Sequence, residues 1–168
     1  DVYLSSVYFY LHFQYNGWFF FACMGLFYGF LNLKKSDHPF FNSFFTLFAI
    51  ACIPAYFLST LWLKLPVWLY GITVLAAFIQ VAIWFKFIGV LTKTRKEFIK
   101  NYALSLRYIL IFVGLALSIK LALQLGSTLP TVSQLAFGFR PIVIAYLHLV
   151  LLAIISLFLL FYIYASHL

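Results

Sequence analysis

The chain has 168 residues, of which 66% are hydrophobic and only 8% are charged. An ordinary soluble domain has about 45–50% apolar and about 25% charged residues. This composition excludes a water-soluble domain, a disordered chain and a DNA-binding domain, and it predicts an all-α polytopic membrane protein. The apolar runs are long and unbroken, which favours helices over alternating transmembrane strands.

Five apolar stretches are long enough to cross a bilayer, because a crossing helix needs about 20 residues. We expect these helices at residues 2–33, 40–62, 67–91, 102–125 and 140–165. The first is longer than a perpendicular crossing, so it should tilt or project at one end. Pro54 should kink the second helix, and Pro141 suits the first turn of the fifth.

The five helices are predicted to form a single transmembrane domain over residues 1–168, with residues 126–134 as the fourth loop. The chain begins Asp-Val-Tyr, and no charged region with a cleavage site opens it, so no signal peptide is predicted. Because the chain does not begin with Met and its first helix starts almost at residue 1, we expect a fragment of a larger chain, a processed product or an incompletely assigned larger protein.

The basic residues predict the orientation of the helices. Loops one and three, with the helix ends beside them, carry Lys34, Lys35, Lys86, Lys93, Arg95, Lys96, Lys100 and Arg107. Loops two and four carry only Lys64, Lys120 and Arg140. The positive-inside rule then places loops one and three in the cytoplasm, with the N-terminus outside and the C-terminus inside. The same distribution explains the net charge of +8 without a nucleic-acid partner.

Polar side chains inside the apolar stretches are costly and usually face the bundle interior. His12 and His148 fall at comparable depth in the outer half of the membrane, and two imidazoles on different helices can ligate haem, copper or iron. Asn16, one turn from His12, could orient its imidazole. Lys120 and Arg140 lie near the outer helix ends, where they could hold haem propionates or a substrate anion, or snorkel to the headgroups.

Each histidine also has a structural interpretation as an interhelical hydrogen-bond partner, which is the role expected of Gln80. Tyr8 lies one turn above His12 and could donate a hydrogen bond or serve as a redox neighbour. Cys23 and Cys52 lack metal-ligand spacing and are expected to act as small apolar side chains. His38 and His167 lie at the predicted cytoplasmic ends and are expected to be solvated. The 22 Phe residues could pack together or line an apolar cofactor.

Two stretches resemble a known group of proteins. They are Tyr10-Leu11-His12-Phe13-Gln14-Tyr15-Asn16-Gly17-Trp18-Phe19 and Phe139-Arg140-Pro141-Ile142-Val143-Ile144-Ala145-Tyr146-Leu147-His148-Leu149. They resemble segments of an uncharacterised multi-span membrane family typical of Bacteroidetes-type bacteria, which is in turn similar to the haem-copper oxidase and NnrS group. The resemblance implies a bacterial inner-membrane protein in which His12 and His148 ligate haem or copper. The adjacent His-His pair and the His-x-His of the oxidases are not present in this sequence.

Three functions follow as hypotheses. The first is an integral membrane redox protein that binds haem or copper through His12 and His148, with Asn16, Lys120 and Arg140 around the cofactor. The second is a non-catalytic accessory or scaffolding subunit of a bacterial membrane complex, with other subunits or the rest of the same chain as partners. The third is a carrier or channel for a small or lipophilic solute. The redox hypothesis requires the two imidazoles to face each other, and the carrier hypothesis requires a polar tunnel that reaches both leaflets.

Overall fold

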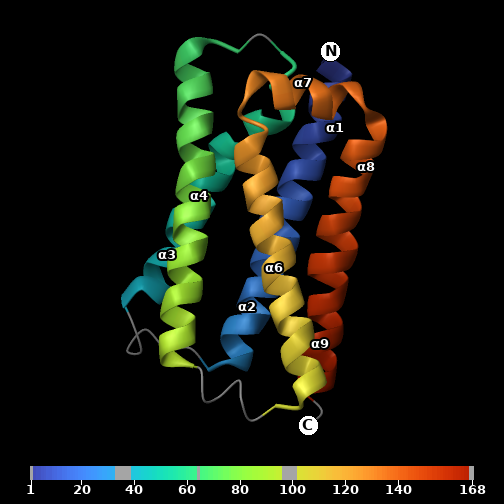
Figure 1. Cartoon of the computed structure of the whole chain (residues 1–168). Helices are drawn as coiled ribbons and strands as arrows, with labels where there is room; N and C mark the ends of the chain where they lie inside the picture. Colours follow the sequence, from blue (N-terminus) through green and yellow to red (C-terminus); the bar gives the residue numbers. More distant parts are fainter. Residues whose placement is uncertain (1, 33–38, 64, 96–101, 167–168) are drawn as a thin grey trace.

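The computed structural model describes residues 2–32, 39–63, 65–95 and 102–166, and these residues form helices without any strand. They make five helical columns (Figure 1). The first column is α1 (Val2–His12), the π-helical segment η1 (Phe13–Phe19) and α2 (Phe20–Phe30). The others are α3 (Pro39–Ala55) with the 3₁₀ segment η2 (Tyr56–Thr60), α4 (Val67–Thr94), α6 (Leu104–Gly126), and α8 (Arg140–His148) with the π-helical segment η3 (Leu149–Ser156) and α9 (Leu157–Ser166).

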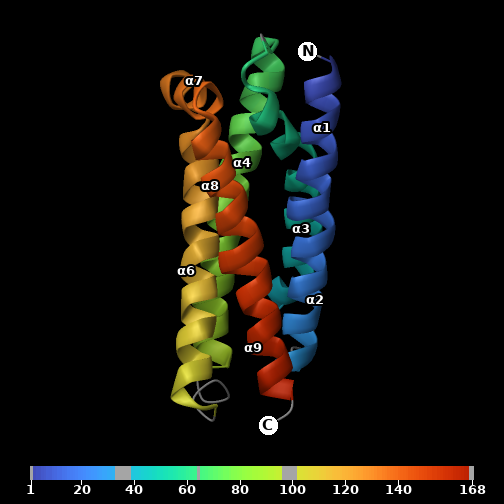
Figure 2. The same ribbon diagram turned by 90° about the vertical axis from the view of Figure 1, so that its right-hand side faces the viewer.

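The columns pack as a closed ring. α3 packs against α4, α4 against α6, α6 against η3 and α9, and α9 against α2, while η2 lies beside α1. Figures 1 and 2 show the long axes running roughly side by side, with the N-terminus and the C-terminus at opposite ends of the bundle. We call these the N-terminal end and the C-terminal end. A ring of this kind can enclose a space along its axis, and that space holds the candidate site.

Four of the columns are long and apolar enough to cross a membrane. They run over Pro39–Thr60, Val67–Thr94, Leu104–Gly126 and Pro141–Ser166. Their bounds lie within a few residues of the predicted second to fifth helices. The first column is long enough to cross as well, but Gln14, Asn16 and several Tyr and Trp residues lower its hydropathy. The structure thus supports a multi-pass membrane protein.

The outer surface of the bundle is apolar. Large side chains such as Ile50, Ile53, Leu75 and Phe78 are more than half exposed. A soluble monomer rarely exposes contiguous apolar surface on this scale. The surface therefore suits contact with lipid chains, as the composition predicts.

Aromatic rings fill the interior toward the C-terminal end. Phe44, Phe48, Phe87 and Phe161 are among the most buried side chains in the described part of the chain. The Phe44 and Phe87 rings lie 4.6 Å apart between centroids, and Phe20 stacks on Phe48 at 4.5 Å. Aromatic pairs at these separations add to the stability that burial provides. Much of the Phe excess therefore packs α2, α3, α4 and α9 together.

Two prolines change the local helix geometry. Pro54 supplies no backbone N–H, and the α-helix gives way to 3₁₀ geometry at Tyr56. The irregularity expected at Pro54 is thus present. The prediction of a loop over residues 126–134 is wrong in part, because α7 (Pro130–Gly138) begins inside it. Pro130 stands in the first turn of α7, where its missing N–H costs nothing.

Arg95 links α4 to the residues that follow α2 at the C-terminal end of the bundle. Its Nε donates to the carbonyl of Leu31 at 3.2 Å and its Nη2 to the carbonyl of Asn32 at 3.1 Å. These carbonyls follow α2, where Asn32 has a positive φ of 48°. Carbonyls at a helix C-terminus lack intrahelical donors and attract cations. Arg95 therefore joins the end of α4 to the end of α2.

Candidate intramembrane binding site

His12 is a buried hydrogen-bonded residue at the end of α1. It is only 4% exposed. Its Nε2 lies 3.0 Å from the carbonyl oxygen of Cys52, and its Nδ1 lies 3.2 Å from the amide nitrogen of Asn16. A carbonyl only accepts, so Nε2 carries the proton and donates, while Nδ1 accepts from the Asn16 amide. Both ring nitrogens are therefore engaged.

The contact partners of His12 have a clear structural basis. Cys52 belongs to the last turn of α3, where carbonyls lack the usual donor four residues on. His12 satisfies one of them from the neighbouring column. Asn16 reaches His12 because residues four apart share a helix face, as the sequence spacing predicts. The Cys52 thiol donates weakly to the carbonyl of Asn16 at 3.5 Å, so this cysteine packs as a buried small residue.

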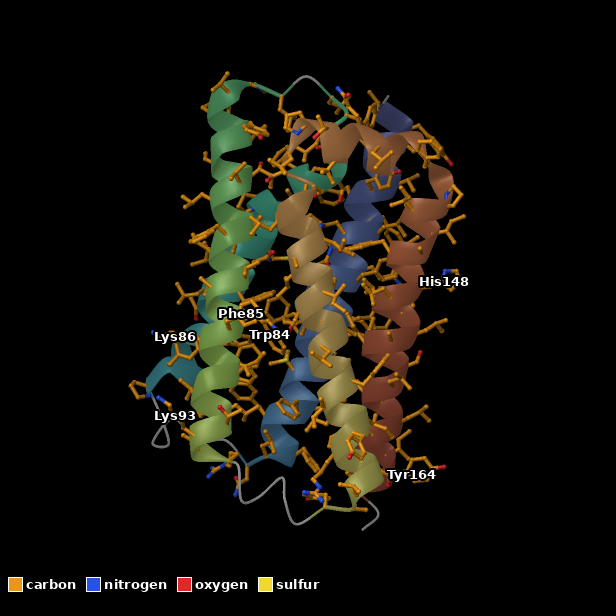
Figure 3. The ribbon with its side chains drawn as sticks, viewed as in Figure 1. Trp84, Phe85, Lys86, Lys93, His148 and Tyr164 are labelled. Carbon is orange, nitrogen blue, oxygen red and sulfur yellow. The ribbon has the colours of Figure 1, made fainter. Side chains whose placement is uncertain are left out.

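His148 lies on the outside of the bundle. Figure 3 shows its side chain pointing away from the other columns, and the residue is exposed. Its Nδ1 donates to the carbonyl of Ile144, one turn back, at 2.8 Å. The structure thus places His12 inside and His148 outside, and it does not bring the two imidazoles together.

The residues present do not fit a cofactor ligated by this histidine pair. His12 has no free ring nitrogen, and His148 faces outward. Within the described residues, no three His, Cys, Asp or Glu side chains come together as a metal site.

Lys120 is the most unusual side chain of the interior. It stands in α6, only 4% exposed, and is close enough to His12 and Cys52 to interact with both electrostatically. The three acidic residues of the chain, Asp1, Asp37 and Glu97, all lie outside the described residues. The described part of the chain therefore offers no carboxylate to pair with the Lys120 ammonium group. The snorkelling geometry considered for Lys120 is not adopted.

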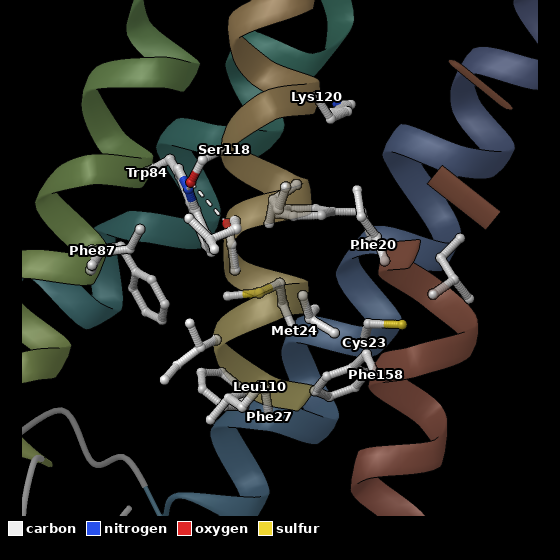
Figure 4. A pocket seen from close by; sticks show the side chains of 18 of the residues that line it. Phe20, Cys23, Met24, Phe27, Trp84, Phe87, Leu110, Ser118, Lys120 and Phe158 are labelled. Carbon is white, nitrogen blue, oxygen red and sulfur yellow. Dashed lines mark hydrogen bonds between the residues drawn. The ribbon is translucent and has the colours of Figure 1, made fainter. Parts of the chain in front are cut away.

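A large cavity of about 840 Å³ begins at Lys120 and follows α6 toward the C-terminal end. Figure 4 shows Lys120 at its upper end, pointing from α6 toward the first column. The wall of the large cavity is mainly aliphatic and aromatic, with Phe20, Met24, Phe27, Trp84, Leu110 and Phe158 among the lining residues. The Trp84 indole donates to the Ser118 hydroxyl at 2.9 Å, which removes one polar group from the cavity surface.

Arg107 lies at the other end of the large cavity. Its Nε is buried and has no hydrogen-bond partner among the described residues. Lys120 and Arg107 are thirteen residues apart in α6, which is about 20 Å at a rise of about 1.5 Å per residue. The large cavity is thus apolar with a cation at each end, and exposed lining residues such as Phe85, Ile111 and Leu115 leave it partly open to the outer surface.

A small cavity of about 360 Å³ adjoins the large one toward the N-terminal end. Tyr15, Asn16 and Val150 line both cavities, so they form the partition between them. The small cavity is also lined by Gln124, which is 7% exposed and whose Oε1 has no partner within the described part of the chain. The partition comes from η1 and η3, which contact each other.

The remaining predicted residues are placed as follows. Tyr8 lines the small cavity together with His12. Arg140 begins α8, but its side chain lies outside the described side chains, as do the whole of His38 and His167. Gln80 is buried, and the interhelical hydrogen bond expected of it is not found for its Oε1 among the described residues.

Sequence reasoning missed the role of Arg107 as a cavity residue, because its position near a helix end matched a solvated charge. The sequence also did not predict the hydrogen bond between Trp84 and Ser118, which joins α4 to α6 in the cavity wall. The half-buried Cys23 lines the large cavity rather than a metal site. Only the packing of the columns shows these roles.

Comparison with known proteins gave no match. No family model fits the chain, and neither a curated protein nor a solved structure resembles it. The likeness of residues 10–19 and 139–149 to the oxidase-related family therefore stays a prediction.

Proposed function

We propose that this chain is an integral membrane protein that binds a single-chain amphipathic anion. The anionic group pairs with Lys120, and the apolar chain occupies the large cavity. The observation that carries the proposal is a buried lysine, without a counter-charge among the described residues, at the head of an apolar cavity. This develops the carrier hypothesis rather than the redox one.

The charge argument starts from the cost of burying an ammonium group. Removing a charge from water costs several kcal/mol unless it is paired and hydrogen-bonded. Lys120 has no carboxylate partner within the described residues. A buried, unpaired ionisable residue inside a membrane bundle marks a functional site by default. A ligand carboxylate or phosphate would supply the missing partner through charge-assisted hydrogen bonds.

The shape and lining of the cavity select the rest of the ligand. The distance of about 20 Å from Lys120 to Arg107 exceeds one leaflet of the hydrocarbon core, about 15 Å. One acyl chain of ordinary membrane length can therefore extend along it. The aliphatic and aromatic wall would bury that chain, and burial stabilises it by about 0.8 kcal/mol per methylene group.

We propose that the first column also crosses the membrane, which makes five crossings. Val2–Phe30 is 29 residues long and packs in the same ring as the four apolar columns. The termini at opposite ends of the bundle suit an odd number of crossings (Figure 1). The excess of basic residues in loops one and three then supports an outside N-terminus and a cytoplasmic C-terminus. A bacterial inner membrane follows from the resemblance described above.

The other two hypotheses need something beyond this single chain. A haem or copper centre would have to use the exposed Nε2 of His148 with ligands from another molecule. An accessory subunit would use the apolar surface that here suits lipid. The buried Lys120 and its cavity have no role in either.

The test is native mass spectrometry of the delipidated protein in detergent, with palmitate as the probe. We expect saturable binding of one palmitate per chain. Lys120→Met should weaken binding by about tenfold or more, since a hydrogen bond to a charged group contributes about 1.5–3 kcal/mol. Lys93→Met is the matched control, because Lys93 is exposed and lies outside the cavity. Equal palmitate binding by all three proteins would overturn the proposal.

A further inference from the structure

The two cavities lie end to end and together cross the bundle. They share Tyr15, Asn16 and Val150 as lining residues. The large cavity reaches Arg107 toward the C-terminal end, and the small one reaches Ser127 toward the N-terminal end. Arg107 lies in α6 and Ser127 caps its C-terminus, so they are twenty positions apart, which is about 30 Å, the thickness of the hydrocarbon core.

Polar groups stand along this path at intervals. They are Arg107, Lys120 and Gln124 on α6 and Ser127 at its C-terminal cap. Lys120 and Gln124 are one turn apart on one face, on the two sides of the partition. Gln124 is buried with an unpaired Oε1, and rotation of its amide about χ3 exchanges that oxygen for the donating nitrogen. A head group leaving Lys120 would therefore meet another hydrogen-bonding group within one helix turn.

The partition is built from irregular backbone. Tyr15 and Asn16 lie in η1, and Val150 lies in η3, so both walls of the partition are π-helical. π-helical segments are rare and occur frequently at functional sites. These three side chains lie where the two cavities meet, so a displacement of η1 against η3 would change the opening between them.

We propose that the chain moves the anionic head group of its ligand from one leaflet to the other, past the partition formed by Tyr15, Asn16 and Val150. This rests on the proposed binding function and adds a translocation step to it. The substrate class is the single-chain amphipathic anion of the proposed function, and a phosphate lipid, whose head group stays charged, serves as the probe. The head group passes from Lys120 to Gln124, while the chain follows through the large cavity. No covalent bond changes in this process.

The experiment uses the full chain in liposomes that contain a fluorescent single-chain phosphate lipid with a nitrobenzoxadiazole label on its acyl chain end. Dithionite bleaches only the label in the outer leaflet of protein-free vesicles. Vesicles with the wild-type protein should lose most of the inner-leaflet fluorescence as well. Lys120→Met should slow this loss by about tenfold, in line with its loss of affinity.

Variants of the partition separate translocation from binding. Val150→Phe should slow translocation by about tenfold or more, while in native mass spectrometry it weakens palmitate binding far less than Lys120→Met does. Val150→Ala opens the same contact and should speed translocation, which guards against a Phe variant that merely fails to fold. Leu152→Phe is the matched control, since Leu152 is exposed in the same π-helical segment and should leave both quantities unchanged.

The outcomes distinguish the two proposals. Binding that depends on Lys120 without any wild-type translocation would overturn the translocation step and leave the binding function in place. Palmitate binding that does not depend on Lys120 would overturn both the binding function and the translocation step. Translocation that is unchanged by both Val150 variants would show that the head group does not pass the partition.

Discussion

Replacing Lys120 by Met should stabilise the ligand-free protein while it weakens ligand binding. Met has a similar length and no charge, so it fits the apolar wall without a desolvation penalty. Replacing buried ionic groups by apolar ones is often neutral or stabilising by about 1–4 kcal/mol. A gain of about 2 kcal/mol corresponds to a rise in Tm of about 4–8 °C for a chain of this size.

The assay is thermal unfolding of delipidated protein in detergent, followed by intrinsic fluorescence, with and without palmitate. At a hundred times Kd, ligand should stabilise the wild type by about 2.7 kcal/mol and the Lys120→Met protein by much less. Lys93→Met should stay within about 0.5 kcal/mol of the wild type. A ligand-free Lys120→Met protein that melts below the wild type would refute the reasoning, because Lys120 would then contribute a native interaction.

Three further predictions concern the scaffold and the cavity. His12→Phe should lower the free energy of unfolding by about 1–3 kcal/mol, because the carbonyl of Cys52 and the amide of Asn16 lose their partner. His148→Phe should change the free energy of unfolding by less than about 0.5 kcal/mol. Equal thermal shifts for the two variants would contradict the structural role of His12. Arg95→Met should lower the free energy of unfolding by about 1–3 kcal/mol in the same assay, because the carbonyls of Leu31 and Asn32 lose their hydrogen-bond donor. An unchanged Tm would show that this link contributes nothing to stability. Gly114→Phe should fill the large cavity and abolish palmitate binding in native mass spectrometry. The Tm should not fall, since a Cβ at Gly114 meets nothing within 4 Å. Gly89 lies outside the cavity, so the control variant Gly89→Phe should bind palmitate normally.

Membrane residence could be predicted from the sequence because it depends on composition and run length. The second to fifth helices follow from uninterrupted apolar stretches, and their bounds are close to those expected. The α7 helix was missed because residues 126–134 are polar and short, and only Pro130 in the first turn marks its start. The π-helical segments η1 and η3 leave no comparable mark in the sequence.

The candidate site was only partly predictable. Polar side chains are rare in the apolar stretches, and that rarity alone indicated His12, Asn16 and Lys120. The one-turn spacing predicted the contact between His12 and Asn16. Depth along a helix could not tell which way a side chain faces. His12 and His148 fall at similar predicted depth, yet the first faces the ring and the second faces outward. The direction of a side chain depends on how the columns pack, and a sequence of apolar residues all round each helix contains little information about that.

The most direct test of the central claim is whether an acyl chain enters the large cavity next to Trp84. Trp84 is 6% exposed and lines that cavity, whereas Trp18 and Trp68 are largely exposed on the outer surface. A variant with Trp18, Trp62 and Trp68 replaced by Phe keeps Trp84 as its single tryptophan. We expect palmitate brominated in mid-chain to quench Trp84 fluorescence saturably, with one ligand per chain, and Lys120→Met to remove that quenching at the same concentration. Quenching that only follows the total bromolipid concentration, and is equal in the Lys120→Met protein, would contradict a binding site in the cavity.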